Sequence, residues 1–316
     1  MADPGPAEME PQPSVARNAA LLSLGNILSR TLGLVREIVI PHYFGATGLV
    51  SAFRTAEFVV KMLYDLLVGG MLSAALVPVL SDYHRPERRI EFAQAAGALF
   101  TVLAGVAALA VLGVEVWAPQ LVALLGQDLP GEYQAAAVRL MRLTAPAVWM
   151  FSASGALAAI LFARQRFALV ALGDGLYNLG VILAVPLLHR RLGIESLAVG
   201  VLLGSLIQLG LRLPELRGLG LRLTATLRHP ALRRIWLLYL PILLSLAAGI
   251  VQGGIDTRLA NSTGERSLAY MRQATTLYQL PHGLVAVAIS LAALPTLSRW
   301  AAAGEWAAYR RTLGAG

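Results

Sequence analysis

The chain has 316 residues, of which 57% are hydrophobic and only 14% charged, with a mean hydropathy of +0.64 and a formal net charge of +8. Because an ordinary soluble domain is about 25% charged, this composition indicates a membrane protein. Lys61 is the only lysine, and the arginines lie between apolar runs rather than among basic and aromatic positions, so we expect no nucleic-acid partner.

The sequence contains no cysteine, and its five histidines are scattered without the spacing of a metal site. We therefore expect no disulfide, no metal and no cofactor. No nucleophile stands beside a base at the end of an apolar run, and no phosphate-binding P-loop motif occurs. We predict that the chain is not an enzyme.

The first residues, 1–14, are rich in proline and acidic, which is typical of a disordered cytoplasmic tail. Beyond them, apolar runs of the length that spans a bilayer, about 20 residues, recur along the chain. We expect eight spans, at residues 17–40, 48–80, 92–117, 136–162, 167–188, 194–213, 233–256 and 268–297. The predicted fold is all-α, a polytopic bundle of about eight transmembrane helices. The second run is long enough to be tilted or broken, and Gly69-Gly70 is the expected break.

The arginines of the connections predict the orientation, because cytoplasmic loops carry an excess of basic residues. With the N-terminus inside, fifteen fall on the cytoplasmic side: Arg17, Arg85, Arg88, Arg89, Arg164, Arg166, Arg212, Arg217, Arg222, Arg228, Arg233, Arg234, Arg299, Arg310 and Arg311. The opposite side carries four: Arg190, Arg191, Arg258 and Arg266. We therefore predict a cytoplasmic N-terminus.

The longest basic connection, residues 214–232, divides the predicted spans into two groups. We interpret 15–213 as an N-terminal lobe of six spans, 214–232 as a basic cytoplasmic linker, and 233–316 as the start of a second lobe with two spans. The linker either lies along the anionic inner leaflet or serves only to set the topology.

Polar side chains form stripes along four of the predicted spans, since positions three, four and seven apart share one face of a helix. The first span carries Asn26, Ser29, Arg30, Gly33, Arg36 and Glu37; the second Arg54, Glu57, Lys61 and Asp65; the seventh Ser245, Gly249, Gln252 and Asp256; the eighth Arg272, Thr275, Thr276, Gln279 and His282. Lipid does not tolerate such stripes, so they indicate a hydrated internal cavity on a substrate pathway. The alternative is that they are buried ion pairs, such as Arg54 with Glu57 or Lys61 with Asp65, that fix helix packing. Arg36 and Glu37 are also consistent with an interfacial pair near the outer end of the first span.

Four segments resemble the MviN/MurJ family of lipid II flippases, in register from about residue 14 to the end of the chain. They are SRTLGLVREIVIPHYFGA at 29–46, GGMLSAALVPVLSDY at 69–83, GALAAILFARQRFALVALGDGLYNLGVIL at 155–183 and LPHGLVAVAISLAALPTLSR at 280–299. The resemblance implies a multi-pass protein of the bacterial inner membrane, from the multidrug/oligosaccharidyl-lipid/polysaccharide exporter superfamily, with two lobes around a central cavity. It further implies that an undecaprenyl-diphosphate-linked cell-wall precursor is moved to the outer leaflet for peptidoglycan synthesis.

The resemblance also suggests which side chains meet the substrate. Arg30 and Arg36 match two cavity arginines of the family, and guanidinium groups suit phosphate oxygens. The candidate substrate ligands are Arg30, Arg36, Arg54, Lys61 and Arg272, and the candidate cavity or ion-coupling residues are Asn26, Glu37, Glu57, Asp65 and Asp256. The expected partners are a lipid-linked oligosaccharide diphosphate, the lipid bilayer and proteins of cell-wall synthesis.

The chain departs from the family at three functional positions. Ser51 stands where the family has aspartate, Tyr64 and Asp65 where it has a basic pair, and Thr276 where it has arginine. The family usually has fourteen spans, so we expect either a fragment or a partner half elsewhere. Transport of another lipid-linked oligosaccharide and a non-transporting scaffold of cell-wall assembly therefore stay open. A drug or cation antiporter also stays open, because five basic stripe residues against four acidic ones disfavour a cation site only mildly.

Overall fold

The computed structural model describes residues 13–84, 86–166, 168–216, 229–281, 293, 296, 297, 300, 301 and 303–315. The chain forms two compact units, Met1–Ala269 and Tyr270–Gly316, and each is described by itself. The predicted tail at 1–14 lies almost wholly outside the described residues, as do most of the predicted linker and the later part of the eighth span. The predicted division into lobes therefore stays a prediction.

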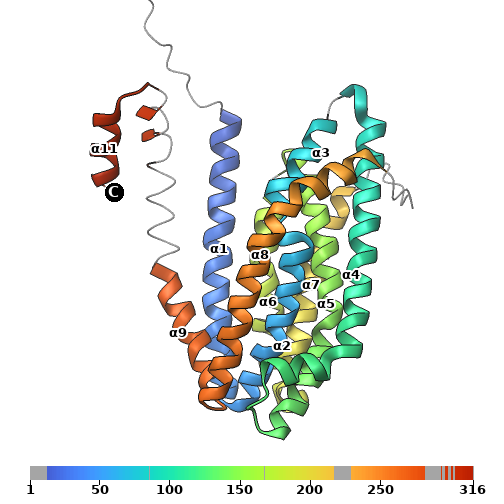
Figure 1. Ribbon diagram of the computed structural model, residues 1–316, viewed down its shortest axis with the longest axis vertical. Coiled ribbons are helices and arrows are strands. Elements are labelled where there is room, and N and C mark those ends of the chain that lie inside the picture. Colours follow the sequence, from blue (N-terminus) through green and yellow to red (C-terminus); the bar gives the residue numbers. More distant parts are fainter. Residues whose placement is uncertain are drawn as a thin grey trace, which may run out of the picture. The chain divides into compact units, whose positions relative to one another are not determined.

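Every described element is helical, which confirms the predicted all-α fold (Figure 1). The long helices are α1 (Pro13–Phe44), α2 (Gly48–Tyr64), α4 (Arg89–Leu125), α5 (Gly131–Ala163), α6 (Ala168–Leu192), α7 (Glu195–Arg212), α8 (Pro230–Thr263) and α9 (Ser267–Pro281). Shorter elements are η1 (Asp65–Gly69), η2 (Leu72–Leu76), α3 (Val77–Tyr83), η3 (Pro86–Arg88), η4 (Leu213–Leu216) and α11 (Trp306–Ala315). The first seven predicted spans each coincide with a helix or, for the second, with the continuous series from α2 to α3.

Six helical stretches of the described chain are long and apolar enough to cross a membrane: Gly48–Tyr83, Arg89–Leu125, Gly131–Ala163, Leu169–Leu192, Glu195–Arg212 and Pro230–Thr263. Helix α1 is not among them, and it carries Arg30, Arg36 and Glu37 within eight residues. The first predicted span is thus long enough to cross a bilayer but less apolar than its neighbours.

The second span is broken at the expected place. The α-helix gives way to wider turns on both sides of Gly70, where the Gly70 N–H donates to the Asp65 carbonyl at 2.9 Å and the Leu76 N–H donates to the Met71 carbonyl at 2.9 Å. Such five-residue turns are rare within helices and often mark functional sites. A Cβ at Gly70 would lie 2.2 Å from Leu246 Cδ1, so glycine here leaves room for α8.

Helix α6 packs between α1 and α7, whereas α5 packs against α2, α4 and α7, and α8 lies along α4 and the broken segment. The contact between α6 and α7 is made by backbone on both sides. A Cβ at Gly180 would lie 2.2 Å from the amide nitrogen of Gly204, and one at Gly204 would lie 2.1 Å from the Tyr177 carbonyl oxygen. Small residues let membrane helices approach this closely.

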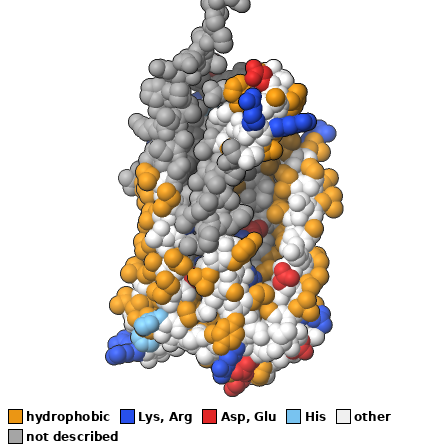
Figure 2. Space-filling view, turned by 90° about the vertical axis from the view of Figure 1, so that its left-hand side faces the viewer, with side chains coloured by type: hydrophobic (Ala, Val, Ile, Leu, Met, Phe, Trp, Pro, Cys, Tyr) orange, Lys and Arg blue, Asp and Glu red, His pale blue; other side chains and the backbone are white. Residues whose placement is uncertain are grey.

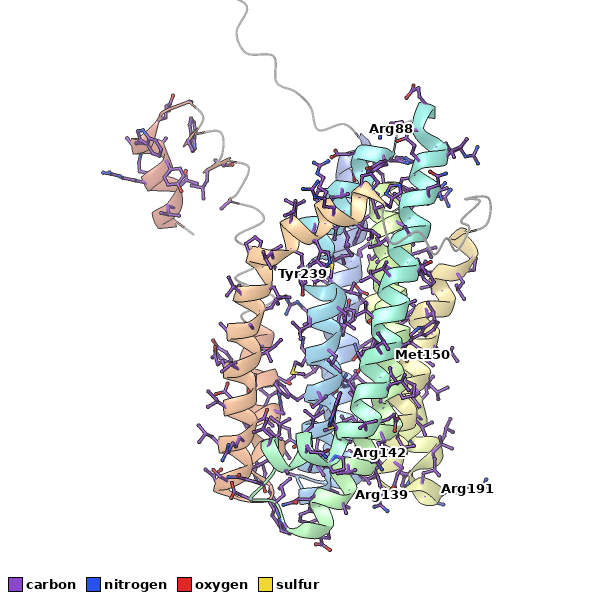
Figure 3. All side chains as sticks on the ribbon, turned by 45° about the vertical axis from the view of Figure 1, so that its right-hand side comes forward. Arg88, Arg139, Arg142, Met150, Arg191 and Tyr239 are labelled. Atoms are coloured by element: carbon purple, nitrogen blue, oxygen red, sulfur yellow. The ribbon has the colours of Figure 1, made fainter. Side chains whose placement is uncertain are left out.

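The outer surface matches a chain that sits in lipid. Large apolar side chains are exposed on α4, where Leu109 is 69% and Trp117 60% exposed, and on α8, where Leu244 is 75% exposed. In Figure 2, orange side chains cover the middle of the described surface and most charged ones lie toward its two ends. Arg88 lies at one end of the helices and Arg191 at the opposite end, as the predicted topology requires (Figure 3).

One arginine of the topology prediction is not a loop residue. Arg212 was counted among the cytoplasmic arginines of the connections, although the predicted sixth span reaches residue 213; it is the last residue of α7 and only 1% exposed. Its guanidinium turns back into the bundle because it finds oxygen acceptors there. Removing it leaves fourteen arginines on the predicted cytoplasmic side against four, so the predicted orientation is unchanged.

Candidate functional site

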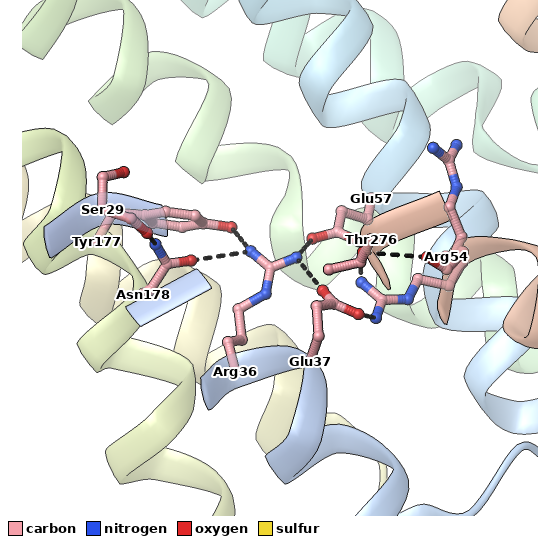
Figure 4. A network of polar contacts seen from close by, with 9 residues as sticks. Ser29, Arg36, Glu37, Arg54, Glu57, Tyr177, Asn178 and Thr276 are labelled. Carbon is pink, nitrogen blue, oxygen red and sulfur yellow. Dashed lines mark hydrogen bonds and ion pairs between the residues drawn. The ribbon is translucent and has the colours of Figure 1, made fainter. Parts of the chain in front are cut away.

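The predicted stripes of α1 and α2 meet in one closed network, the arginine-glutamate ring, made of Arg36, Glu37, Arg54 and Glu57 (Figure 4). Glu57 bridges the two arginines, with Oε1 2.6 Å from Arg36 Nη2 and Oε2 2.7 Å from Arg54 Nη1. Glu37 bridges the same pair, with Oε1 3.2 Å from Arg36 Nη2 and Oε2 bonded to Arg54 Nη2. Each carboxylate therefore binds both guanidinium groups.

The α1–α2 hairpin places these groups at one level. The two helices are joined by a short turn in which Gly45 has φ +64°, a conformation that favours glycine. Arg36 lies eight residues before the end of α1 and Glu57 nine residues after the start of α2, so both are about 12–14 Å from the turn at 1.5 Å per residue. Arg36 and Glu37 are thus paired across two helices, not only with each other as an interfacial pair.

The ring is largely buried and electrically neutral. The side chains of Arg54, Arg36, Glu37 and Glu57 are 3%, 13%, 13% and 20% exposed. Buried charges must be paired, because desolvation costs several kcal/mol per ion. Two cations facing two carboxylates meet this requirement. The buried Nε atoms of Arg36 and Arg54 make no hydrogen bond with any described residue.

Helix α6 supplies the remaining contacts of Arg36, and sequence reasoning missed them. Arg36 Nη1 donates to Tyr177 Oη at 3.0 Å and lies 3.5 Å from Asn178 Oδ1. Asn178, 7% exposed, in turn donates through Nδ2 to the Ser29 carbonyl at 3.5 Å. Two adjacent polar residues inside an apolar run were the available signal, because a polar pair inside a membrane helix needs a partner.

Two further cations of the stripes lie outside the ring. Arg30 is partly exposed and donates from Nε to Asn26 Oδ1 at 3.3 Å, and among the described residues it makes no ion pair. Lys61 pairs with Asp65 at 2.6 Å, and the two side chains are 69% and 33% exposed. The alternative pairings considered above, Arg54 with Glu57 and Lys61 with Asp65, both occur.

The last two candidates, Asp256 and Arg272, are not members of the ring. Asp256 is exposed on α8 and has no ion-pair partner in the part of the chain that is described. Arg272 belongs to the second unit, where its carbonyl accepts from Thr276 Oγ1 at 3.0 Å. The network thus gathers four of the ten candidates, while Arg30 with Asn26 and Lys61 with Asp65 form separate pairs.

Two residues at which the chain departs from the family, Ser51 and Tyr64, make packing or hydrogen-bond contacts of their own. Ser51 is fully buried, and its Oγ accepts from the Ala269 N–H at 3.3 Å, so it satisfies an amide in the first turn of α9 that no helical carbonyl reaches. Tyr64 packs with its ring centroid 5.8 Å from that of Phe151. Its ring also lies over Gly155, where a Cβ would be 3.6 Å from Tyr64 Cε2.

A second ion pair, between a buried arginine and a partly exposed aspartate, joins α5, α6 and α7. Arg212 donates to Asp174 Oδ1 at 2.6 Å, to Ser154 Oγ at 2.7 Å and to the Ser154 carbonyl at 2.9 Å. Gln208 donates to the same Asp174 oxygen at 2.7 Å. Asp174, inside the fifth predicted span, was the signal that sequence reasoning passed over. Among the described residues, no group of three or more His, Asp or Glu side chains is placed to hold a metal ion.

Comparison with known proteins gives a family. A family model described as "Lipid II flippase MurJ" matches residues 40–316, most of the chain. The chain belongs to the MurJ family. The match begins after Arg30, Arg36 and Glu37, so it does not itself cover the α1 half of the ring. This match confirms the family that the sequence motifs predicted. Because lipid II flippases are transporters, it also agrees with the prediction that the chain is not an enzyme.

Individual MurJ proteins extend the comparison. The "Lipid II flippase MurJ" of Burkholderia cenocepacia is 28% identical over 293 residues, which cover 89% of this chain and 57% of that protein. The "Probable lipid II flippase MurJ" of Bdellovibrio bacteriovorus is 30% identical over 309 residues, which cover 93% and 58%. The chain therefore spans little more than half the length of these relatives.

A solved structure, "Lipid II flippase MurJ, inward closed conformation", matches with a TM-score of 0.74 at 22% identity, over 89% of this chain and 59% of the other. At this identity the likeness establishes the fold, a helical membrane bundle. With the six apolar helices, the MurJ family places the chain in the inner membrane as a multi-pass protein, as predicted.

Proposed function

We propose that this chain takes part in moving a lipid-linked diphosphate of the lipid II class from the inner to the outer leaflet. The movement proceeds by alternating access, in which two lobes rock about a site near the middle of the membrane. Support comes from membership in the MurJ family and from the names of relatives that are called lipid II flippases. The chain spans 57% of the Burkholderia relative, so the activity of the whole protein belongs to this proposal.

The observation that carries the proposal is the surplus cation of α1 and α2. Four cations stand between residues 24 and 69, against three carboxylates. The ring and the pair of Lys61 with Asp65 balance three of these cations, which leaves Arg30. A cation without a carboxylate on an apolar helix is costly unless it faces water, a cavity or an anionic ligand.

The position of Arg30 suits an anion that also reaches the ring. Arg30 lies six residues before Arg36, about 9 Å along the axis of α1. Arginine presents a planar fork of donors that matches phosphate oxygens, and charge-assisted bonds of this kind are about twice as strong as neutral ones. We therefore propose that the diphosphate lies along α1, with Arg30 as its first ligand.

Asp256 supports a second candidate, cation antiport. It is an exposed carboxylate on α8 without an ion pair among the described residues, and a cation transporter needs such a group. The surplus charge of α1 and α2 has the opposite sign and favours an anionic substrate. A scaffold of cell-wall assembly would need neither charge.

Binding of radiolabelled lipid II to the 316-residue chain in lipid nanodiscs separates these functions. We expect saturable binding that weakens about tenfold or more in Arg30→Ala, since a charge-assisted hydrogen bond contributes roughly 1.5–3 kcal/mol. Arg139→Ala is the matched control, because Arg139 is 67% exposed and pairs with Glu195 rather than with a residue of the ring. Binding of a lipophilic cation that Asp256→Asn abolishes would favour antiport. Failure to bind any lipid diphosphate would leave the scaffold.

A further inference from the structure

The arginine-glutamate ring has a chemical form that packing alone does not require. Its two carboxylates present four oxygens, and each carboxylate divides its oxygens between the same two guanidinium groups. The arginines thus form a two-pronged anion site, and Glu37 and Glu57 fill it. Tyr177 Oη and Asn178 Oδ1 hold Arg36 from the far side, so its guanidinium faces the carboxylates.

A diphosphate diester matches this pair of carboxylates group for group. Each of its phosphoryl groups carries one negative charge and two non-bridging oxygens, as a carboxylate does. A diphosphate therefore offers the arginines the same total charge and the same number of forked acceptors. Bidentate pairing of arginine is equally suited to carboxylate and phosphate.

We propose that Glu37 and Glu57 are a built-in occupant of the substrate's anion site, which the diphosphate displaces when it binds to Arg36 and Arg54. This inference rests on the proposed function, and it adds that the two carboxylates compete with the diphosphate for the arginines. In the closed ring Glu37 and Glu57 already balance the charge of both arginines, so Arg30 makes the first contact with the substrate. The diphosphate then exchanges with the carboxylates at the ring.

Displacement is required by charge. Two carboxylates and a diphosphate around two arginines would leave two net negative charges in a largely buried site, and like charges at such distances repel strongly. The carboxylates must therefore move away from the guanidinium groups as the diphosphate arrives. Release of the substrate is assisted in the same way, because the carboxylates return to the arginines and restore a neutral ring.

A purely structural ring makes the opposite prediction for substrate affinity. If Glu57 only positions the arginines, its neutralisation disturbs them and weakens binding. If Glu57 competes with the substrate, neutralisation frees both arginines and strengthens binding. Glutamine keeps the size of glutamate and removes the charge, so Glu57→Gln and Glu37→Gln distinguish the two cases.

The experiment measures lipid II binding to the 316-residue chain in nanodiscs, with size-exclusion profiles to establish folding. We expect Glu57→Gln and Glu37→Gln each to bind about tenfold more tightly than the wild type, because one charged competitor is lost. Glu91→Gln is the matched control, because it also removes a carboxylate that pairs with an arginine, Arg88, at 2.5 Å. Glu91 is 50% exposed and is not part of the ring. It should leave the affinity unchanged.

The outcomes distinguish a failure of this inference from a failure of the proposed function. Unchanged or weaker binding in both ring variants, beside a wild type that binds, overturns the inference and leaves the proposed function intact. If only one variant folds, that variant decides, and if neither folds, the ring is needed for folding and the inference fails. Absence of lipid II binding in the wild type and in every variant overturns the proposed function itself.

Discussion

Substituting alanine for Gly180 tests the packing that places α6, and with it Tyr177 and Asn178, beside Arg36. The added Cβ would lie 2.2 Å from the Gly204 nitrogen and 2.3 Å from the Gly200 carbonyl oxygen. Ordinary contact begins at 3.4 Å, so α6 and α7 must separate by about 1.2 Å. Overpacking typically costs about 1–3 kcal/mol. Because backbone atoms cannot change rotamer, we expect a loss of about 3 kcal/mol or more.

The assay is unfolding of the detergent-solubilised protein by heat, followed by fluorescence-detected size exclusion. Gly105→Ala is the control, because a Cβ on Gly105 of α4 has no neighbour within 4 Å. Alanine in a helix is more favourable than glycine by roughly 0.5–1 kcal/mol, so this variant should be as stable as the wild type or slightly more stable. A Gly180→Ala protein that unfolds at the wild-type temperature would refute the backbone contact between α6 and α7.

Three further predictions concern the first part of α8 and the second ion pair. Burial lowers the pKa of His229 below 6.5, and the nearby charge of Glu91 offsets part of this shift. The neutral imidazole ring also accepts a hydrogen bond from the Ala231 N–H through Nδ1 at 3.2 Å. The free energy of unfolding should therefore be highest above pH 6.5 and decline as the pH falls further and the imidazole is protonated. The asparagine side chain introduced by His229→Asn can still cap the helix but does not titrate, and an unchanged decline in this variant would assign it to other groups. Tyr239→Phe should lower the free energy of unfolding by about 1 kcal/mol, since the Tyr239 hydroxyl donates to the Leu66 carbonyl beside the break; no change would mean that water replaces it. Asp174→Asn leaves the guanidinium of Arg212, whose side chain is 2% exposed, without a carboxylate partner. It should lower the free energy of unfolding by about 1–2 kcal/mol, which is less than for a fully buried pair because Asp174 is 58% exposed. A loss under about 0.5 kcal/mol in the same unfolding assay would contradict this prediction.

The fold was largely predictable because apolar runs of bilayer length have few alternatives to helix. Seven predicted spans are helices, and the break at Gly69-Gly70 followed from two adjacent glycines in an overlong run. The helix ends were less predictable. Helix α5 begins at Gly131 rather than 136, because its first turn is polar and hydropathy does not register it. Helix α4 extends to Leu125 rather than 117, because the helix continues through Pro119 and Gln120 into a further apolar stretch.

The site was predictable as a set of charges but not as a set of partners. Spacing placed Arg54 and Glu57 on one face, yet the bridge from each carboxylate to both arginines depends on how α1 and α2 meet. Tyr177, Asn178 and Arg212 were missed because their contacts join helices more than 35 residues apart in sequence. Side-chain direction at the end of α7, which turns Arg212 inward, is set by Asp174 and Ser154 rather than by local pattern.

The measurement that tests the central claim most directly compares two lipids on the wild-type chain in nanodiscs. One is undecaprenyl diphosphate carrying the lipid II sugar, and the other is the uncharged polyprenol of the same length. If the arginines of α1 and α2 bind the diphosphate, the charged lipid should bind at least about tenfold more tightly, and Arg36→Ala should narrow the difference. Equal affinity for both lipids would contradict the account, because binding would then depend on the hydrocarbon chain alone.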